Sequence, residues 1–197
     1  MAIFALAYWG NPVLEKVSER VRDNEFDTHE LYIFSQSLIE TMTANNGVGL
    51  AAPQVNVSKR LFAMELPDHK GSQPFVLCNP TLTATYKATD QKNEGCLSMP
   101  GIYLPVDRST GVVLQYQEPS GKFVEVELTD MDARVVQHEL DHLDGRLFIN
   151  LVSRQLRREA MRQWEKIGSK FQVSSTSAMS APYQALQGAG LMSEVLR

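Results

Sequence analysis

The sequence has few residues of the kinds that mark secreted or membrane-spanning proteins. Only two of its 197 residues are cysteines, Cys78 and Cys96. One disulfide at most is possible, and a free thiol or a metal ligand is the expected state in a chain of this length. The apolar start, residues 1–9, is short, lacks a basic leader and runs into a Gly-Asn-Pro turn. It therefore predicts neither a signal peptide nor a membrane span, and we expect a cytoplasmic protein with no membrane partner.

Neither sign of charge dominates the chain. Nineteen basic and 23 acidic residues leave a formal net charge of −4. This balance argues against sequence-specific binding of nucleic acid, although a basic patch that approaches the ribosome transiently is compatible with it. Apolar residues make up 43% of the chain, which is enough for the core of one domain.

Hydrophobic periodicity divides the chain into helices and strands. Apolar residues at helical spacing predict helices over 28–45, 129–143 and from Ser153 onward. Thr129 begins a Thr-Asp-Met-Asp sequence that resembles a capping box, and Gly145 ends the same helix. β-type patterns predict strands over the ranges 60–66, 75–79, 111–117 and 123–128. The fold class is therefore α+β, with mixed or antiparallel strands around a central helix.

The composition changes near the end of the chain. From residue 172 onward Ser, Ala, Gln and Gly dominate, and no charged residue occurs until Glu194. This composition is typical of a weakly ordered segment. We therefore predict one folded domain over residues 1–171 and a weakly ordered tail over residues 172–197.

The strongest chemical signal is the sequence His-Glu-Leu-Asp-His at residues 138–142. On a helix, positions four apart lie on one face, so His138 and His142 can bind the same divalent metal ion. Glu139 follows the first ligand and is placed to act as a general base on water at the metal. Two of the chain's four histidines have this spacing, which favours a metal site over an ordinary charged helix.

A catalytic metal site usually has a third protein ligand. The zinc peptidase pattern that supplies a third histidine fails here, because position 148 is Phe. A downstream glutamate, Glu159 or Glu165, is possible by its distance along the chain, but both belong to a charged helical stretch. Cys96, which lies in a segment rich in turn-forming residues, is the remaining candidate.

A third unusual segment, GVGLAAPQ, covers residues 47–54. It lacks the glycine-lysine ending of a phosphate-binding loop, so a nucleotide site is a weak interpretation. A tightly packed loop between a helix and a strand is the plain alternative. Small residues also allow a peptide backbone to approach closely, and Gln54 could donate a hydrogen bond to a developing oxyanion.

Three segments together, GVGLAAPQ (47–54), EGCLS (94–98) and QHELDHLDG (137–145), resemble the signature motifs of peptide deformylases. The resemblance covers roughly residues 5 to 168. It implies a metal-dependent amide hydrolase that removes the formyl group from the N-terminal methionine of newly made polypeptides. It also implies one divalent ion per chain, Fe²⁺ in the cell, which Zn²⁺, Ni²⁺ or Co²⁺ can replace.

The resemblance assigns a role to individual residues. The implied metal ligands are Cys96, His138 and His142. The implied catalytic groups are Glu139 as acid and base, with Gln54 and the backbone N–H of Leu97 as oxyanion donors. The implied substrate-binding residues are Gly47, Val48, Gly49 and Gly95, with Met131 and Val135 at the methionine pocket. Glu94 is expected to pair with Arg108, and Tyr103 stands where many bacterial members have arginine.

Two other functions remain as alternatives at this point. A metallopeptidase that cuts internal peptide bonds would share the helical motif but would take its third ligand downstream. A binding module with a structural metal would need a fourth protein ligand, and neither His29 nor His69 has suggestive spacing.

Overall fold

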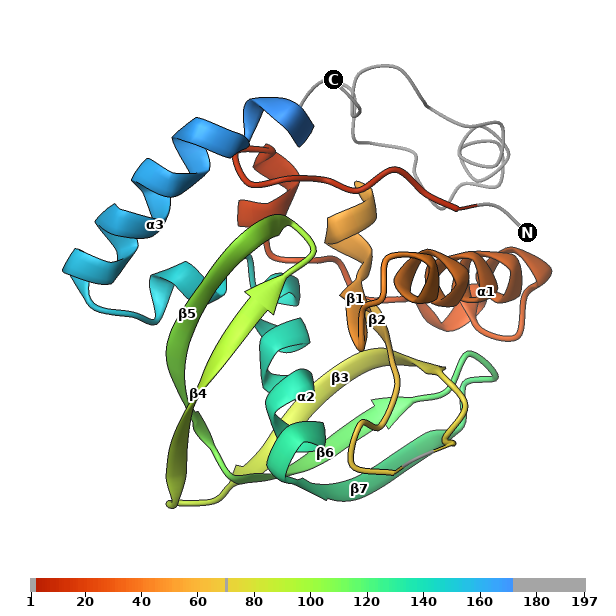
Figure 1. Cartoon of the computed structure of the whole chain (residues 1–197). Helices are drawn as coiled ribbons and strands as arrows, with labels where there is room; N and C mark the ends of the chain where they lie inside the picture. The colour runs from red at the N-terminus through yellow and green to blue at the C-terminus, as the bar shows by residue number, and fades with distance from the viewer. Residues whose placement is uncertain (1–2, 70, 172–197) are drawn as a thin grey trace.

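Within the described residues, three α-helices, four short 3-10 helices and seven strands build the fold. Figure 1 shows their arrangement in a computed structural model. The structure describes residues 3–69 and 71–171, so the predicted tail, residues 172–197, lies outside the described residues. The three α-helices are α1 (His29–Ala44), α2 (Asp130–Leu143) and α3 (Arg154–Ile167). The strands are β1 (Gly49–Ala51), β2 (Leu61–Met64), β3 (Phe75–Thr85), β4 (Thr89–Cys96), β5 (Met99–Ser109), β6 (Gly111–Gln117) and β7 (Phe123–Thr129).

The strands form two antiparallel sheets. Five of them make a sheet in the order β1-β2-β3-β6-β7, and β4 pairs with β5 in a separate hairpin. The register of the large sheet places Leu50 opposite Ala63 and Leu114 opposite Val126. The α+β prediction, with antiparallel strands around a central helix, is thereby confirmed.

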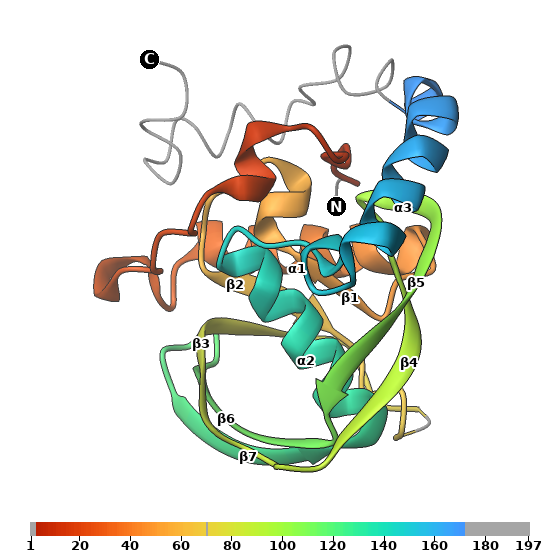
Figure 2. The same cartoon turned by 90° about the vertical axis from the view of Figure 1, so that its left-hand side faces the viewer.

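Helix α2 lies between the large sheet and the hairpin. Figure 2 shows it beside the concave face of the sheet, with β4 and β5 on its other side. Its apolar residues, among them Val136, Leu140 and Leu143, join a buried cluster with Leu77 and Leu114 of the sheet. Because the helix is packed on both sides, its backbone is held in place, and so are the residues of the motif at 138–142.

The helix termini confirm two sequence predictions and correct a third. The Thr28 side chain accepts a hydrogen bond from the Leu31 N–H at the start of α1, and Gly145 follows α2 with a φ of +68°. Thr129, however, makes no side-chain capping bond, so the capping box predicted there is wrong. Asp68 caps α2 instead, because its Oδ2 accepts the N–H groups of Met131 (2.8 Å) and of the following residue (3.3 Å).

The hairpin β4–β5 is absent from the sequence prediction. The segment around Cys96 was expected to be irregular, yet Cys96 is the last residue of β4. Strand β4 has the sequence TDQKNEGC and buries only Glu94, so its alternation is invisible in hydropathy. Strand β5 packs Ile102, Leu104 and Val106 against the region around α3.

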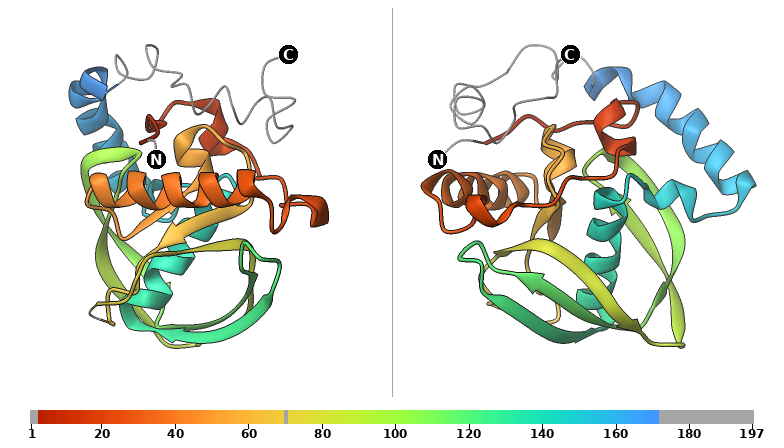
Figure 3. Two further views of the ribbon diagram at one scale, coloured as in Figure 1. Left: turned by 90° about the vertical axis from the view of Figure 1, so that its right-hand side faces the viewer. Right: turned by 180° about the vertical axis from the view of Figure 1, so that it is seen from behind.

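Helix α1 lies against β1 and β2, as the left view of Figure 3 shows, and α3 lies against β5. The segment before α1 contains two short 3-10 helices, Pro12–Glu15 and Asp23–Glu25, and its first residues contact the parts of the chain around Gln54 and Ser98. The N–H of Ala7 donates to the carbonyl of Gln54 (2.7 Å), and that of Trp9 donates to the carbonyl of Ser98 (2.9 Å). Within the described residues, no helix combines the length and hydropathy that a membrane span requires.

Candidate metal centre

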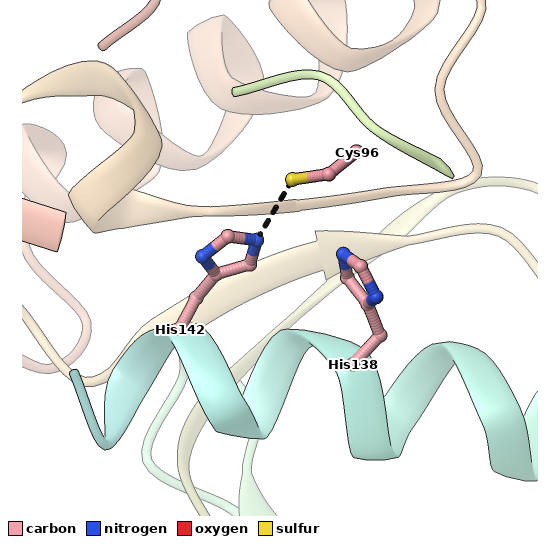
Figure 4. A group of neighbouring side chains, drawn as sticks. All are labelled: Cys96, His138 and His142. Atoms are coloured by element: carbon pink, nitrogen blue, oxygen red, sulfur yellow. Dashed lines mark hydrogen bonds between the residues drawn. The ribbon is translucent and has the colours of Figure 1, made fainter. Parts of the chain in front are cut away.

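Three possible metal-ligand atoms lie close together at the C-terminal half of α2. His138 and His142 project from one face of the helix toward the end of β4, where Cys96 lies (Figure 4). The Sγ of Cys96 is 3.2 Å from Nε2 of His142, and the three ligand atoms lie within 4.8 Å of one another. A tetrahedral ion held by a thiolate and an imidazole separates sulfur from nitrogen by about 3.6 Å. The spacing therefore fits a single divalent metal ion.

The other candidate ligands are elsewhere. Glu159 and Glu165 are both exposed on α3, outside the group of potential ligands in the described chain. Phe148, at the position where the peptidase pattern needs a third histidine, is buried against the His138 ring with centroids 5.8 Å apart. The downstream-ligand alternative thus has no support in the geometry.

The two imidazoles differ in charge. Burial opposes a charge on His138, but hydrogen bonds to Cys96 and Glu94 raise its pKa well above the ordinary value, so a metal ion bound there would displace a proton. His142 is 1% exposed, and burial lowers its pKa well below the ordinary value, which favours the neutral ring that a metal requires. His138 has its Nδ1 2.9 Å from Oε2 of Glu94. Burial opposes the charge on Glu94, but hydrogen bonds from His138 and Arg108 lower its pKa to about 2. An ionised carboxylate can only accept, so Nδ1 of His138 carries the proton and Nε2 is left for a metal.

Glu94 is held by more partners than the sequence predicted. The Arg108 guanidinium donates Nε and Nη2 to the two carboxylate oxygens at 3.0 Å each, which confirms the expected pair. Arg134 of α2 is a second buried arginine on the same carboxylate, at 2.7 Å from Oε1. Arg108 also forms an ion pair with Asp141 of α2. The sequence analysis did not assign a role to Arg134 or Asp141. Their interactions depend on the β4–β5 hairpin, which the sequence did not predict.

Glu139 lies between the two histidines in sequence and is 4% exposed. Its burial raises the pKa of the carboxyl to about 7, and the His138 charge opposes that rise. Among the described residues, its Oε2 has no hydrogen-bond partner. A buried carboxylate oxygen without a partner is unusual and is available to a water molecule or a substrate.

Gln54 faces the same centre from the other side. Its Oε1 accepts the Ala51 N–H at 2.8 Å, which fixes the orientation of the amide. Its Nε2 then lies 3.2 Å from Oγ of Ser98 and 3.5 Å from Sγ of Cys96. Leu97 and Ser98 form the two-residue connection between β4 and β5, so the backbone at Leu97 is next to the ligand cysteine.

A cavity of about 450 Å³ opens beside these groups. Its walls include all but one of the residues given a site role in the sequence, namely Gly47, Val48, Gly49, Gln54, Gly95, Cys96, Leu97, Met131, Val135, His138 and Glu139. His142 is the exception; it is 1% exposed and lies next to Cys96. Residues not anticipated there include Asn45, Asn93, Ile102 and Arg134.

Three of the four glycines that line the cavity have close neighbours within the chain that explain why they are glycine. A Cβ on Gly49 would collide with the Glu139 carboxylate, and one on Gly47 would lie 2.8 Å from the Leu97 side chain. A Cβ on Gly95 would lie 2.6 Å from the ring of Tyr103, which covers that glycine and is 69% exposed at the rim. Small residues are therefore needed for packing among the site residues, whether or not a peptide binds there.

Comparison with known proteins agrees with this site. The family model for polypeptide deformylase matches residues 3–158. This chain belongs to the peptide deformylase family. It is 40% identical over 151 residues to the peptide deformylase of Thermotoga maritima, a match that covers 77% of this chain and 88% of that protein. Among solved structures, a peptide deformylase from Legionella pneumophila superposes with a TM-score of 0.78 at 30% identity, covering 90% of this chain and 100% of that one.

Membership of the family establishes the activity. The deformylase is a metal-dependent hydrolase that removes the N-formyl group from nascent peptides. The cluster of Cys96, His138 and His142 is its candidate site for a divalent metal. The interpretations as a metallopeptidase or as a structural metal module are set aside.

Proposed function

We propose that Cys96, His138 and His142 hold the metal ion of this deformylase, and that Glu139 is its proton acceptor and donor. The observation that carries the proposal is the meeting of the three ligand atoms within 4.8 Å beside the cavity that Glu139 lines. When bound, a divalent ion supplies a Lewis acid that polarises the formyl oxygen and makes water more acidic. The chain's own residues account for the remaining steps.

Glu139 moves the proton. Its unpartnered Oε2 can accept a proton from the attacking water and then deliver it to the amine that leaves with the methionine. The formyl carbon gains the new C–O bond and loses its C–N bond, so formate and a free amino terminus are the products. Because Glu139 is not one of the proposed ligands, its loss should affect the chemistry and spare metal binding.

The oxygen that becomes negative needs donors. Gln54 presents its fixed Nε2 toward the centre, and the backbone N–H of Leu97 is the second proposed donor. Each such donor is typically worth about 3–4 kcal/mol in the transition state. The Gln54 amide keeps its orientation through the Ala51 N–H, so it has little to reorganise during the reaction.

The substrate is proposed to lie in the 450 Å³ cavity in extended form. The backbones of Gly47, Val48, Gly49 and Gly95 are the proposed partners of the peptide main chain. Met131 and Val135 line the same cavity and offer an apolar surface to the methionine side chain.

Two substitutions test the assignment of ligands and base. Cys96→Ala should lose most of the bound metal, and Glu139→Gln should keep the metal and the fold but lose several orders of magnitude in kcat. Metal analysis and formate release from formyl-Met-Ala measure the two effects, with Glu159→Ala as a matched acidic control. Full metal in Cys96→Ala together with loss in Glu159→Ala would overturn the ligand set.

Fe²⁺ is the proposed metal in the cell. The donor set alone also accepts zinc, nickel and cobalt. Fe²⁺ beside a thiolate is open to oxidation by O₂, so the iron form should be fast under argon and decay in air, while Ni²⁺ or Co²⁺ should give stable activity. The test is to reload the stripped protein with each ion and to measure formate release before and after exposure to air. Equal kcat/KM for the zinc and iron forms, with no effect of air, would make this a zinc enzyme.

We also propose that the enzyme works in the cytoplasm close to the ribosome, where its substrates emerge. Helix α3 and the turn after it expose the basic residues Arg154, Arg157, Arg158, Arg162, Lys166 and Lys170. Even with the exposed Glu159 and Glu165, this segment has a net positive charge although the whole chain is acidic. Contact with an RNA-rich surface would weaken as salt rises. Co-sedimentation with ribosomes at 50 and 300 mM salt, with Arg157→Glu/Arg158→Glu as the test variant, would show whether this face is used.

A further inference from the structure

Arg134 is the one arginine of helix α2. It lines the cavity but contacts none of the three proposed metal ligands. It is 3% exposed. Its Nη1 donates to Oε1 of Glu94 at 2.7 Å and to the carbonyl of Val106 at 2.9 Å. Its Nη2 donates to the carbonyl of Asp90 at 2.9 Å and to its carboxylate at 2.6 Å. One side chain of α2 is therefore bonded to both strands of the β4–β5 hairpin.

The Glu94 carboxylate connects Arg134 to His138. The two residues are four apart on α2 and lie on the same face, with Oε1 accepting from Arg134 and Oε2 from His138. The fork of Arg108 supplies two further bonds. A carboxylate has about four acceptor positions, so Glu94 is fully occupied. The last torsion of a glutamate has a broad energy minimum, and these donors therefore decide where Oε2 points.

Arg108 of β5 also reaches the helix, through its ion pair with Asp141, so its fork connects Glu94 to the C-terminal part of α2. Arg134 lies one turn before His138 and adds a second connection on the N-terminal side of that residue. Arg134 belongs to the helix that carries both histidines and ties the same carboxylate, and the start of β4, to that helix. Without Arg134, Oε1 of Glu94 would keep one donor, Arg108. The hairpin would also lose its two hydrogen bonds at Asp90 and the one at the Val106 carbonyl.

We infer that Arg134 is a positioning residue for His138. It sets the place of the Glu94 carboxylate, which holds the His138 ring with Nε2 toward Cys96. The inference rests on the ligand set proposed above. A purely structural ion pair is the competing explanation, and it predicts lower stability with no specific effect on metal retention.

The test compares Arg134 with another arginine of similar surroundings. Arg60 has a side chain that is 16% exposed, and it donates to the Asp144 carboxylate (2.8 Å) and the Pro80 carbonyl (3.3 Å), with no contact to Glu94. Arg134→Met, Arg134→Lys and Arg60→Met would be loaded with Co²⁺. The rate of release to a chelator would be followed through the absorption of the cobalt–thiolate bond, and the Tm of each metal-stripped chain would be measured.

Arg134→Met should release Co²⁺ about tenfold faster than the parent protein, as expected when an outer partner of a metal ligand is removed. Arg134→Lys keeps the charge but loses the planar fork, so its release should be accelerated less. Arg60→Met should lower the Tm and leave the release rate within twofold of the parent.

Two results would overturn the inference. One is parental release from Arg134→Met, or from Arg134→Lys if the methionine variant does not fold. The other is equal acceleration by Arg60→Met at a similar loss of Tm. The Co²⁺ content of Cys96→Ala, measured by metal analysis, separates the two proposals, because full Co²⁺ binding without Cys96 would refute the ligand set and not the role of Arg134.

Discussion

Replacing Gly49 by alanine would displace the base of the reaction. An ideal Cβ at this position overlaps the Glu139 carboxylate and lies 2.8 Å from its Cδ and 2.9 Å from its Cγ. Glu139 is 4% exposed but lines the cavity, so its carboxylate would shift away from Gly49 toward the cavity. The carboxylate would have to retreat by about 1 Å to regain ordinary van der Waals contact. A misplacement of that size in a reacting group lowers the rate by about 10²-fold, which corresponds to about 2.7 kcal/mol in the barrier.

The effect of Gly49→Ala should appear in kcat, with metal content unchanged. A glycine that mattered only through contact with the peptide backbone would raise KM instead, so steady-state formate release separates the two roles. A second comparison places Gly49→Ala in a Glu139→Ala background, where no further loss is expected because the displaced group is already missing. A kcat within threefold of the parent, or a full additional loss without Glu139, would refute the reasoning.

Three other predictions follow from single features of the chain. Asp68→Ala removes the cap of α2 and should lower the free energy of unfolding by about 1 kcal/mol, measured by urea denaturation, with a smaller effect in Asp68→Asn. Burial raises the pKa of Cys78 to about 12, so this thiol should not react at pH 8 while the chain is folded. A thiol reagent should therefore modify no cysteine in the metal-loaded protein, only Cys96 after chelation, and both cysteines after unfolding. A second reactive thiol in the folded chain would contradict this. Truncation after residue 171 should leave kcat/KM within a few-fold of the value for the full chain, because the composition of residues 172–197 predicts no contribution to the site. A large loss of kcat/KM would show that these residues do contribute.

Local patterns were enough to predict the parts of the fold that rest on local interactions. Helix α1 begins and ends within a residue of the expected range, and α3 starts at its Ser153 cap as predicted. The hairpin β4–β5 was missed because β4 has almost no apolar side chain and β5 contains two prolines. Its stability comes from pairing and from the ion pairs of Glu94, which depend on residues more than a dozen positions away.

The candidate site divides in the same way. The histidine pair and Glu139 could be predicted because one helical turn brings them together. Cys96 was only the remaining candidate for a third ligand, and the resemblance to a family was needed to assign it that role. Arg134 and Asp68 could not be predicted from the sequence, since each acts on a partner distant in the chain. The same holds for Gly49, whose need to be glycine is visible only once Glu139 lies against it.

The arrangement of the three proposed ligands also bears on the folding and lifetime of the protein. The histidines are brought together as soon as α2 forms, but Cys96 is 46 residues from His142. An ion that joins them closes a long loop, and a permanent cross-link over that length would destabilise the unfolded chain by about 4 kcal/mol in the chain-entropy model. Oxidation or chelation that removes the ion would thus leave an enzyme that is inactive and also unfolds more readily. The cell's proteases could then clear damaged molecules in preference to working ones.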